Sequence, residues 1–248
     1  PENIREHFEN IITRPHGLVL VTGPTGIGKT TTLYAALNIL NKAESKIITV
    51  EDPVEYRLPR INQVQVKPDI GLTFARVLRT ALRQDPDIVL VGEIRDHDTV
   101  EMALRASMTG HMVLSTLHTN DAISTVNRLI DMGAEGFLIA TALRAVLAQR
   151  LVRKICNNCK TEDTIENSDV SRFTALIDQA DEHVKFYHGA GCPHCNNTGY
   201  SGRIGVFEFL EIDETLADDL RREDSSAFAE HAIKNPNFRP FSKHAMEY

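Results

Sequence analysis

Tryptophan is absent from the 248-residue chain, and aromatic residues make up only 6% of it. Proteins that grip single-stranded nucleic acid stack its bases on aromatic side chains. This composition therefore argues against a base-stacking platform. The formal net charge of −7 points the same way, because a basic surface is the usual footprint of nucleic acid binding.

Long hydrophobic runs are also lacking. No apolar run approaches the roughly 18 residues that suggest a membrane span. A hydrophobic content of 42% and a charged content of 25% are typical of a soluble globular protein with one large or two modest domains. The chain opens with Pro1 and not with Met, and we expect it to be a fragment that lacks N-terminal domains.

Cysteine is scarce, and all four cysteines fall in two pairs, "CNNC" and "CPHC". Two such pairs are the ligand pattern of a closed tetrahedral zinc site, in which four thiolates leave no position for water or substrate. Disulfides would need an oxidising compartment, and a redox pair would not need a second copy. The pattern therefore predicts structural zinc bound by Cys156, Cys159, Cys192 and Cys195.

The two cysteine pairs are 32 residues apart, which is longer than a minimal zinc ribbon requires. We therefore expect an inserted subdomain between them, with a helix over residues 168–183. The whole zinc-binding subdomain is expected to span residues 151–203.

A glycine-rich stretch follows the first apolar run. The segment "HGLVLVTGPTGIGKTTTLYAALNIL" predicts a strand, a loop and a helix in that order. Gly23, Gly28, Lys29 and Thr30 satisfy the pattern G-x-x-x-x-G-K-[ST] in the context that it requires. Loop N–H groups and the positive end of the helix hold phosphates. Lys29 is expected to reach the β- and γ-phosphates and the Thr30 hydroxyl to hold Mg²⁺.

Carboxylates follow two further apolar runs, as a hydrolase would need. The strand-like "DIVLVGEIRD" leads to Glu93, with Gly92 where an aspartate is usual, and "KIITVEDPVEY" leads to Glu51, Asp52 and Glu55. Ligands of open α/β sheets lie at the carboxyl ends of the strands, so these acids should face the nucleotide. One of the acids after the second run could orient and deprotonate the attacking water, and Glu93 would act through a water or the metal.

Two histidines flank a third apolar run, "HMVLSTLHTND". His111 precedes this run and His118 follows it. His118 is therefore expected on the nucleotide side, where it could sense the γ-phosphate. For His111 a structural and a functional role are equally open, because a lone histidine is often structural.

Arginines occupy the polar face of the predicted helix in "LTFARVLRTALRQDPD". They form either a solvated face or a surface that meets a neighbouring subunit or its nucleotide, where an arginine in trans accelerates phosphoryl transfer. Arg95 is a further candidate. The arginines considered for this role are Arg76, Arg79, Arg83 and Arg95.

The order of apolar runs and helical patterns defines the expected fold. Strands alternate with helices from His16 to about Gly133, which predicts a mostly parallel sheet flanked by helices, as in P-loop proteins of the RecA-like type. This ATPase core should span residues 1–150. Residues 135–155 are expected to form a helix that leads to the first cysteine pair. Residues 204–248 should form a C-terminal strand and short helices.

These blocks together resemble one family. "GPTGIGKTTTLY", "VEDPVEY", "LRQDPDIVLVGEIRD", "TGHMVLSTLHTNDA" and the paired cysteines are similar to the secretion ATPase superfamily, and within it to the ATPases of type IV pilus assembly and type II secretion. The similarity covers about residues 1–210. Retraction ATPases generally lack the four cysteines, so their presence favours pilus extension or secretion. Ile27 departs from the family, in which a small serine is more usual.

The resemblance implies roles for these blocks. Walker A falls on residues 23–30, the Asp box on residues 51–55 with Glu55 as catalytic base, Walker B on Glu93, and the His box on His111 and His118. The catalytic set implied in this way is Lys29, Glu55, Glu93 and His118. The nucleotide-binding set is Gly23, Pro24, Thr25, Gly26, Ile27, Gly28, Lys29, Thr30, Thr31 and Glu51.

The family also implies an assembly. It implies a homo-hexameric ring that hydrolyses ATP with Mg²⁺ in the cytoplasm and works at the inner membrane through a platform protein. Two other classes stay open: a P-loop nucleic-acid translocase with a zinc knuckle, and a nucleotide switch without hydrolysis. The net charge argues against the first class, and the acids at the strand ends argue against the second.

Overall fold

The computed structural model describes residues 2–163, 185–246 and 248. The chain divides into two compact units. Unit 1 comprises Pro1–Gln149 and Phe209–Phe238, and unit 2 comprises Arg150–Glu208 and Arg239–Tyr248. The helix expected over residues 168–183 lies outside the described residues.

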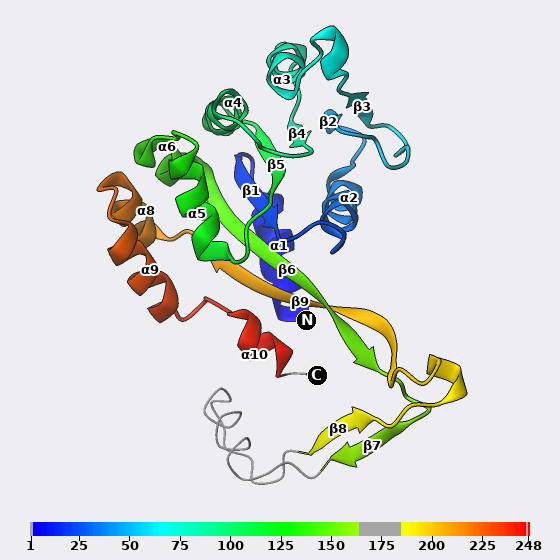
Figure 1. Cartoon of the computed structure of the whole chain (residues 1–248). Coiled ribbons are helices and arrows are strands. Elements are labelled where there is room, and N and C mark those ends of the chain that lie inside the picture. Colours follow the sequence, from blue (N-terminus) through cyan, green and yellow to red (C-terminus); the bar gives the residue numbers. More distant parts are fainter. Residues whose placement is uncertain (1, 164–184, 247) are drawn as a thin grey trace. The chain divides into compact units, whose positions relative to one another are not determined.

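The main sheet has seven strands in the order β3-β2-β4-β5-β1-β6-β9 (Figure 1). Helices separate its five parallel strands before β6 along the chain, as the sequence predicts, except that β2 leads to β3 without a helix. Their bounds are β1 Gly17–Thr22, β2 Ile47–Glu51, β3 Asn62–Gln65, β4 Ile88–Val91 and β5 Met112–Leu117.

Four of these strands are buried along their whole length, namely β1, β2, β4 and β5. Parallel strands that are covered on both faces read as continuous apolar runs, so the runs in the sequence identify them correctly. The predicted α/β fold with a mostly parallel sheet is confirmed.

The connections explain which helices cover which face. The chain moves from β1 across to β2 through α2 (Lys29–Leu40), and back from β4 to β5 through α4 (His97–Met108). Crossovers between parallel strands are right-handed, so opposite directions of travel place α2 and α4 on opposite faces (Figure 1). Helix α1 (Glu2–Ile12) contacts α2, whereas α3 (Phe74–Ala81) and α6 (Gly136–Ala142) contact α4.

The remaining elements of unit 1 continue this pattern. Helix α5 (Ala122–Asp131) contacts α6 and α9 (Ser225–Lys234), and α8 (Glu214–Arg221) contacts α6 and α9. Short 3-10 turns occupy Pro68–Ile70 and Leu82–Gln84. The short helices expected after the last strand are confirmed.

The expectation of one helix over residues 135–155 is wrong. Helix α6 ends at Ala142, and β6 runs from Leu143 to Ile155. Strand β1 is paired on its other side with β5, and residues from Leu143 to Ala148 supply its second parallel partner. Leu, Ala, Arg and Gln favour helices, but hydrogen bonding to a buried strand overrides this weak preference.

Unit 2 contains a small two-stranded sheet besides the outer parts of β6 and β9 (Tyr200–Glu211). Strands β7 (Lys160–Asp163) and β8 (Phe186–Gly189) pair antiparallel. A 3-10 turn covers Pro193–Cys195, and helix α10 covers Phe241–Ala245. In the described part of the chain, no helix combines the length and the apolar character needed to cross a membrane.

Candidate nucleotide pocket and cysteine cluster

The glycine-rich loop joins β1 to α2 at the carboxyl edge of the sheet. Gly23 has φ 136°, and a Cβ there would lie 2.5 Å from the backbone oxygen of Gln149, so the loop needs glycine at its start. Gly28 is the N-cap of α2 with φ 89°, a left-handed conformation that glycine adopts without strain. The backbone N–H groups at this helix start form the kind of cradle that binds phosphate.

Lys29 is buried at the base of the loop. Its Nζ donates to the carbonyl oxygens of Gly23 at 2.7 Å and Pro24 at 2.9 Å. Burial lowers the pKa of Lys29, and the nearby Glu93 carboxylate opposes this effect. The ammonium is thus held against the loop at the start of α2.

Glu93 connects three of the predicted blocks. Its carboxylate is 2.7 Å from the guanidinium of Arg95 and 3.1 Å from Nε2 of His118. The same guanidinium lies 3.8 Å from Asp52. Glu93 and Asp52 raise the pKa of Arg95, chiefly through the hydrogen bond that Arg95 donates to Glu93. The ends of β2, β4 and β5 therefore meet in one charged cluster.

Glu51 is held differently from the other acids. It is 3% exposed and accepts hydrogen bonds from the hydroxyls of Tyr34 and Thr49 and from Nε2 of Gln63. Burial and these interactions with Glu51 raise the pKa of Tyr34. The Glu51 carboxylate is thus fixed by three donors from three different elements.

A cavity of about 680 Å³ opens between the loop and these strand ends. Its wall also includes Tyr34, Tyr56 and Phe74. A pocket of this size lined by a few convergent polar groups is the usual form of a small-molecule site. The predicted site residues that line it are Thr25, Gly26, Gly28, Lys29, Thr30, Thr31, Glu51, Glu55, Glu93, Arg95 and His118.

Other predicted residues lie outside the lining of this cavity. Gly23, Pro24 and Ile27 shape the loop without lining the cavity. Of the four candidate arginines, Arg95 lines the pocket, and the other three, Arg76, Arg79 and Arg83, are exposed on α3 and the turn after it.

His111 lies at the opposite end of β5 from the pocket. Its Nδ1 is 2.9 Å from the carbonyl oxygen of Ala106 and 3.3 Å from the Thr109 hydroxyl. These contacts secure the end of α4 before the strand begins. This geometry favours a structural role for His111 over a functional one.

Gln149 contacts the phosphate loop, and the sequence analysis did not single it out. Its side chain is 3% exposed, donates to the Ile27 carbonyl and accepts from the Thr32 hydroxyl, each at 2.8 Å. Tyr34 and Gln63, which hold Glu51, were also missed. Only the pairing of β6 with β1 brings Gln149 to the loop, and the amino-acid composition of β6 is typical of a helix.

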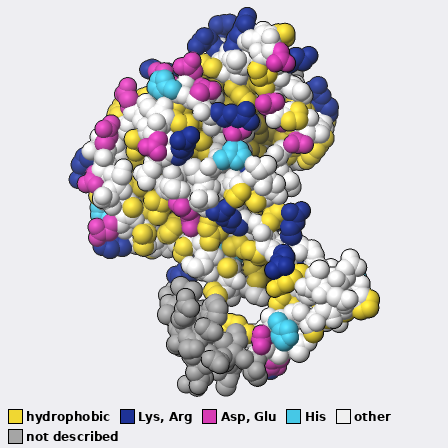
Figure 2. Space-filling model, viewed as in Figure 1, with side chains coloured by type: hydrophobic (Ala, Val, Ile, Leu, Met, Phe, Trp, Pro, Cys, Tyr) yellow, Lys and Arg dark blue, Asp and Glu magenta, His cyan; other side chains and the backbone are white. Residues whose placement is uncertain are grey.

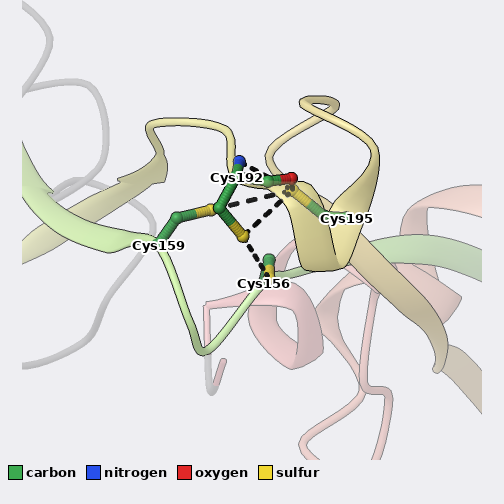
Figure 3. Close-up of side chains that lie close together, drawn as sticks. All are labelled: Cys156, Cys159, Cys192 and Cys195. Carbon is green, nitrogen blue, oxygen red and sulfur yellow. Dashed lines mark hydrogen bonds between the residues drawn. The ribbon is translucent and has the colours of Figure 1, made fainter.

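The four cysteines converge in unit 2 from the end of β6, the start of β7 and the turn before β9 (Figure 3). All their sulfur atoms lie within 4.8 Å of one another. Three Sγ–Sγ distances are 3.9, 3.8 and 3.7 Å. Four sulfurs at about 2.3 Å from a tetrahedral zinc would be about 3.8 Å apart, so the cluster fits zinc.

The thiols are free cysteines, and backbone donors support a thiolate among them. The N–H groups of Cys192 and Gly199 each lie 3.3 Å from Sγ of Cys195. Burial alone would raise the pKa of Cys195, but hydrogen bonds, led by these two, lower it, whereas burial raises the pKa of the neighbouring Cys159. A thiolate is the form that ligates zinc, so this local geometry favours metal binding.

The model of the family described as type II/IV secretion system protein matches residues 1–246. The chain belongs to this family. It is 53% identical over 224 residues to type II secretion system protein E of Dickeya dadantii, covering 90% of this chain and 44% of that protein. The chain therefore spans less than half the length of this relative.

Two further matches carry names that bear on function. The type IV pilus assembly ATPase PilB of Myxococcus xanthus is 52% identical over 208 residues, which are 82% of this chain and 36% of that protein. The solved structure of the pilus retraction motor PilT with bound ADP has a TM-score of 0.68 and 30% identity, covering 95% of this chain and 60% of that one. These matches confirm the family that the sequence motifs indicate.

Proposed function

We propose that this chain is the motor domain of a bacterial machine for type II secretion or type IV pilus assembly, and that it binds and hydrolyses ATP. The observation that carries the proposal is the single pocket lined by both the phosphate loop and Glu93. A phosphate cradle alone would suit a nucleotide switch. Carboxylates at the ends of β2 and β4 add the groups that hydrolysis needs.

In this proposal the loop holds the phosphates of ATP. The backbone N–H groups at the start of α2 contact the phosphate oxygens, and Lys29 turns from the carbonyls of Gly23 and Pro24 to the β- and γ-phosphates. The Thr30 hydroxyl, which lines the pocket, and Glu93 would hold Mg²⁺ directly or through water. When bound, this ion neutralises charge on the β- and γ-phosphates.

Glu55 is the proposed base for the attacking water. It is exposed and lines the pocket, whereas Glu93 is paired with Arg95 and His118. The water oxygen forms a bond to the γ-phosphorus, its proton passes to Glu55, and the bond from the γ-phosphorus to the bridging oxygen of ADP breaks. His118, which lies 3.1 Å from Glu93, is proposed to respond to the γ-phosphate through it.

The proposed assembly is a homo-hexamer that works in the cytoplasm at the inner membrane. Membership of the secretion family supports it, and the exposed Arg76, Arg79 and Arg83 are the proposed contacts with a neighbouring subunit. An exposed arginine could reach the nucleotide of a neighbouring subunit. The proposed partners are a membrane platform protein and other parts of the machine, and not nucleic acid. On the face shown in Figure 2, basic and acidic side chains are interspersed.

Zinc is the proposed metal of the four cysteines, and its role is structural. Four thiolates fill a tetrahedral site and leave no position for a substrate. The metal would hold together the turns that carry the two cysteine pairs, and with them the subdomain proposed over residues 151–203. This subdomain then offers a shaped surface to a partner in the machine.

Glu93→Gln tests the enzymatic part of the proposal. In the purified protein, we expect the rate of ATP hydrolysis to fall at least 100-fold (~2.7 kcal/mol), because the variant loses the charge that supports metal and water. The affinity for ADP should change less than threefold. Glu101→Gln, a half-buried acid on α4 that also pairs with an arginine and a histidine, is the matched control and should keep the wild-type rate.

The outcomes separate the alternatives. Tight ATP binding with no hydrolysis in the wild-type protein would favour the switch. Hydrolysis stimulated by DNA and suppressed by salt would favour the translocase. The same variant in the source organism, with surface pili and secreted enzymes counted, then assigns the machine: lost pili indicate pilus assembly and lost secretion indicates type II secretion.

A further inference from the structure

We infer that Gln149 is a positioning residue that holds the phosphate-binding loop in its binding conformation. The inference rests on the proposed nucleotide site and adds to it a residue from β6, outside the motif itself. No group on Gln149 lines the pocket, so its action on nucleotide would pass through the loop.

Strand register brings Gln149 to the loop. Strands β1 and β6 pair in parallel, with Thr22 opposite Ala148. The next residue of each strand is therefore adjacent at the carboxyl edge, and these residues are Gly23 and Gln149. The 2.5 Å separation between a Cβ at Gly23 and the Gln149 backbone oxygen shows how closely the two backbones approach.

The side chain of Gln149 then joins the two sides of the loop's last turn. Its Nε2 donates to the Ile27 carbonyl, and its Oε1 accepts from the Thr32 hydroxyl in the first turn of α2. A glutamine amide both donates and accepts, whereas glutamate only accepts and methionine does neither strongly. Position 149 therefore uses both the donor and the acceptor of the glutamine amide.

The segment between these two contacts is the one that needs support. It contains Gly28, the N-cap of α2, which has no side chain with which to cap the helix. Glycine also loses more conformational freedom on ordering than any other residue. By fixing Ile27 and Thr32, Gln149 orders the N–H groups between them before phosphate arrives, which reduces the cost of binding.

Nucleotide affinity tests this role in the purified 248-residue chain. Gln149→Met keeps the length of the side chain and removes both hydrogen bonds, and we expect it to weaken binding of a fluorescent ADP analogue about tenfold. Thr32→Val removes only one of the bonds and should weaken binding about threefold. Gln84→Met, an exposed glutamine of the turn after α3, is the matched control and should bind as the wild type does.

A double-mutant cycle separates positioning from general damage. If Gln149 acts through Thr32, the double variant should bind about tenfold more weakly than wild type, rather than the ~30-fold that independent effects would give. Hydrogen exchange gives a readout without nucleotide. The amides of residues 25–30 should exchange faster in Gln149→Met, with exchange in β5 unchanged.

The possible results lead to different conclusions. Wild-type affinity and wild-type exchange in Gln149→Met would overturn the inference and leave the proposed function intact. A wild-type chain with no affinity for ADP or ATP would overturn the proposed function, and the exchange measurement would still decide whether Gln149 orders the loop. If Gln149→Met does not fold, Thr32→Val alone decides, because unchanged affinity in that variant contradicts the inference.

Discussion

Loss of one hydroxyl in Tyr34→Phe tests how far the buried Glu51 carboxylate depends on its donors. Glu51 is 3% exposed, and the Tyr34 hydroxyl is one of its three donors. A hydrogen bond to a charged group contributes about 1.5–3 kcal/mol. We therefore expect the free energy of unfolding to fall by about 2 kcal/mol, which lowers Tm by about 4–8 °C for a chain of this size.

Thermal and urea unfolding measure this change, with Tyr56→Phe as control. The Tyr56 ring packs edge-on against Tyr34 at 4.7 Å between centroids, but the residue is 54% exposed. Loss of its hydroxyl should cost less than about 0.5 kcal/mol, as for other exposed substitutions. Equal effects of the two substitutions would refute the claim that the bond to Glu51 sets the cost.

Alkaline pH gives a second test of the same contact. The pKa of Tyr34 is raised in the folded chain, so above the ordinary tyrosine pKa of about 10 the unfolded chain loses this proton more readily than the folded one. The contribution of Tyr34 to stability is therefore complete below about pH 10 and is lost as the pH rises further. Tyr34→Phe should show a weaker loss of stability above pH 10 than the wild type, and parallel curves would contradict this assignment.

Two further predictions concern the ion pair at the pocket and the cysteine cluster. Arg95→Gln should lower the rate of ATP hydrolysis about tenfold with little change in KM, because Glu93 loses a partner. The free energy of unfolding should change by less than about 1 kcal/mol, since the Arg95 side chain is 57% exposed. Cys192→Ser should abolish stoichiometric zinc in metal analysis and leave the affinity for ADP within twofold of the wild type. His194 is an exposed residue between two of the proposed ligands. The control His194→Ser should therefore keep one zinc per chain. Retention of zinc by Cys192→Ser would contradict the four-thiolate site.

The sequence predicts the parts of the fold that local patterns determine. Continuous apolar runs mark the strands that are buried on both faces. The acids and His118 follow the ends of those runs, and parallel strands bring their carboxyl ends to one edge. Glu93 and His118 are 25 residues apart in sequence and 3.1 Å apart in the structure, for this reason.

The parts that local patterns do not determine depend on neighbours in space. Residues 143–155 have a helical composition, yet they form β6 because β1 offers a row of backbone groups that need partners. The role of Gln149 follows from this pairing. A prediction that assigns this segment to a helix therefore does not bring Gln149 to the loop. The donors of Glu51 were hidden for a similar reason, because Tyr34 comes from α2 and Gln63 from β3.

The two units differ in what holds each of them together. In unit 1 whole strands are buried, as β1 and β5 are. In the described part of unit 2, the buried hydrophobic side chains are Cys156, Cys195 and Val206. Two of these three belong to the proposed zinc site. Small units with so little buried apolar surface need a cross-link or a metal, and binding of zinc then supplies folding free energy directly. Removal of zinc should therefore unfold unit 2, whereas the phosphate loop, which is built by β1, α2 and β6 within unit 1, retains its supports.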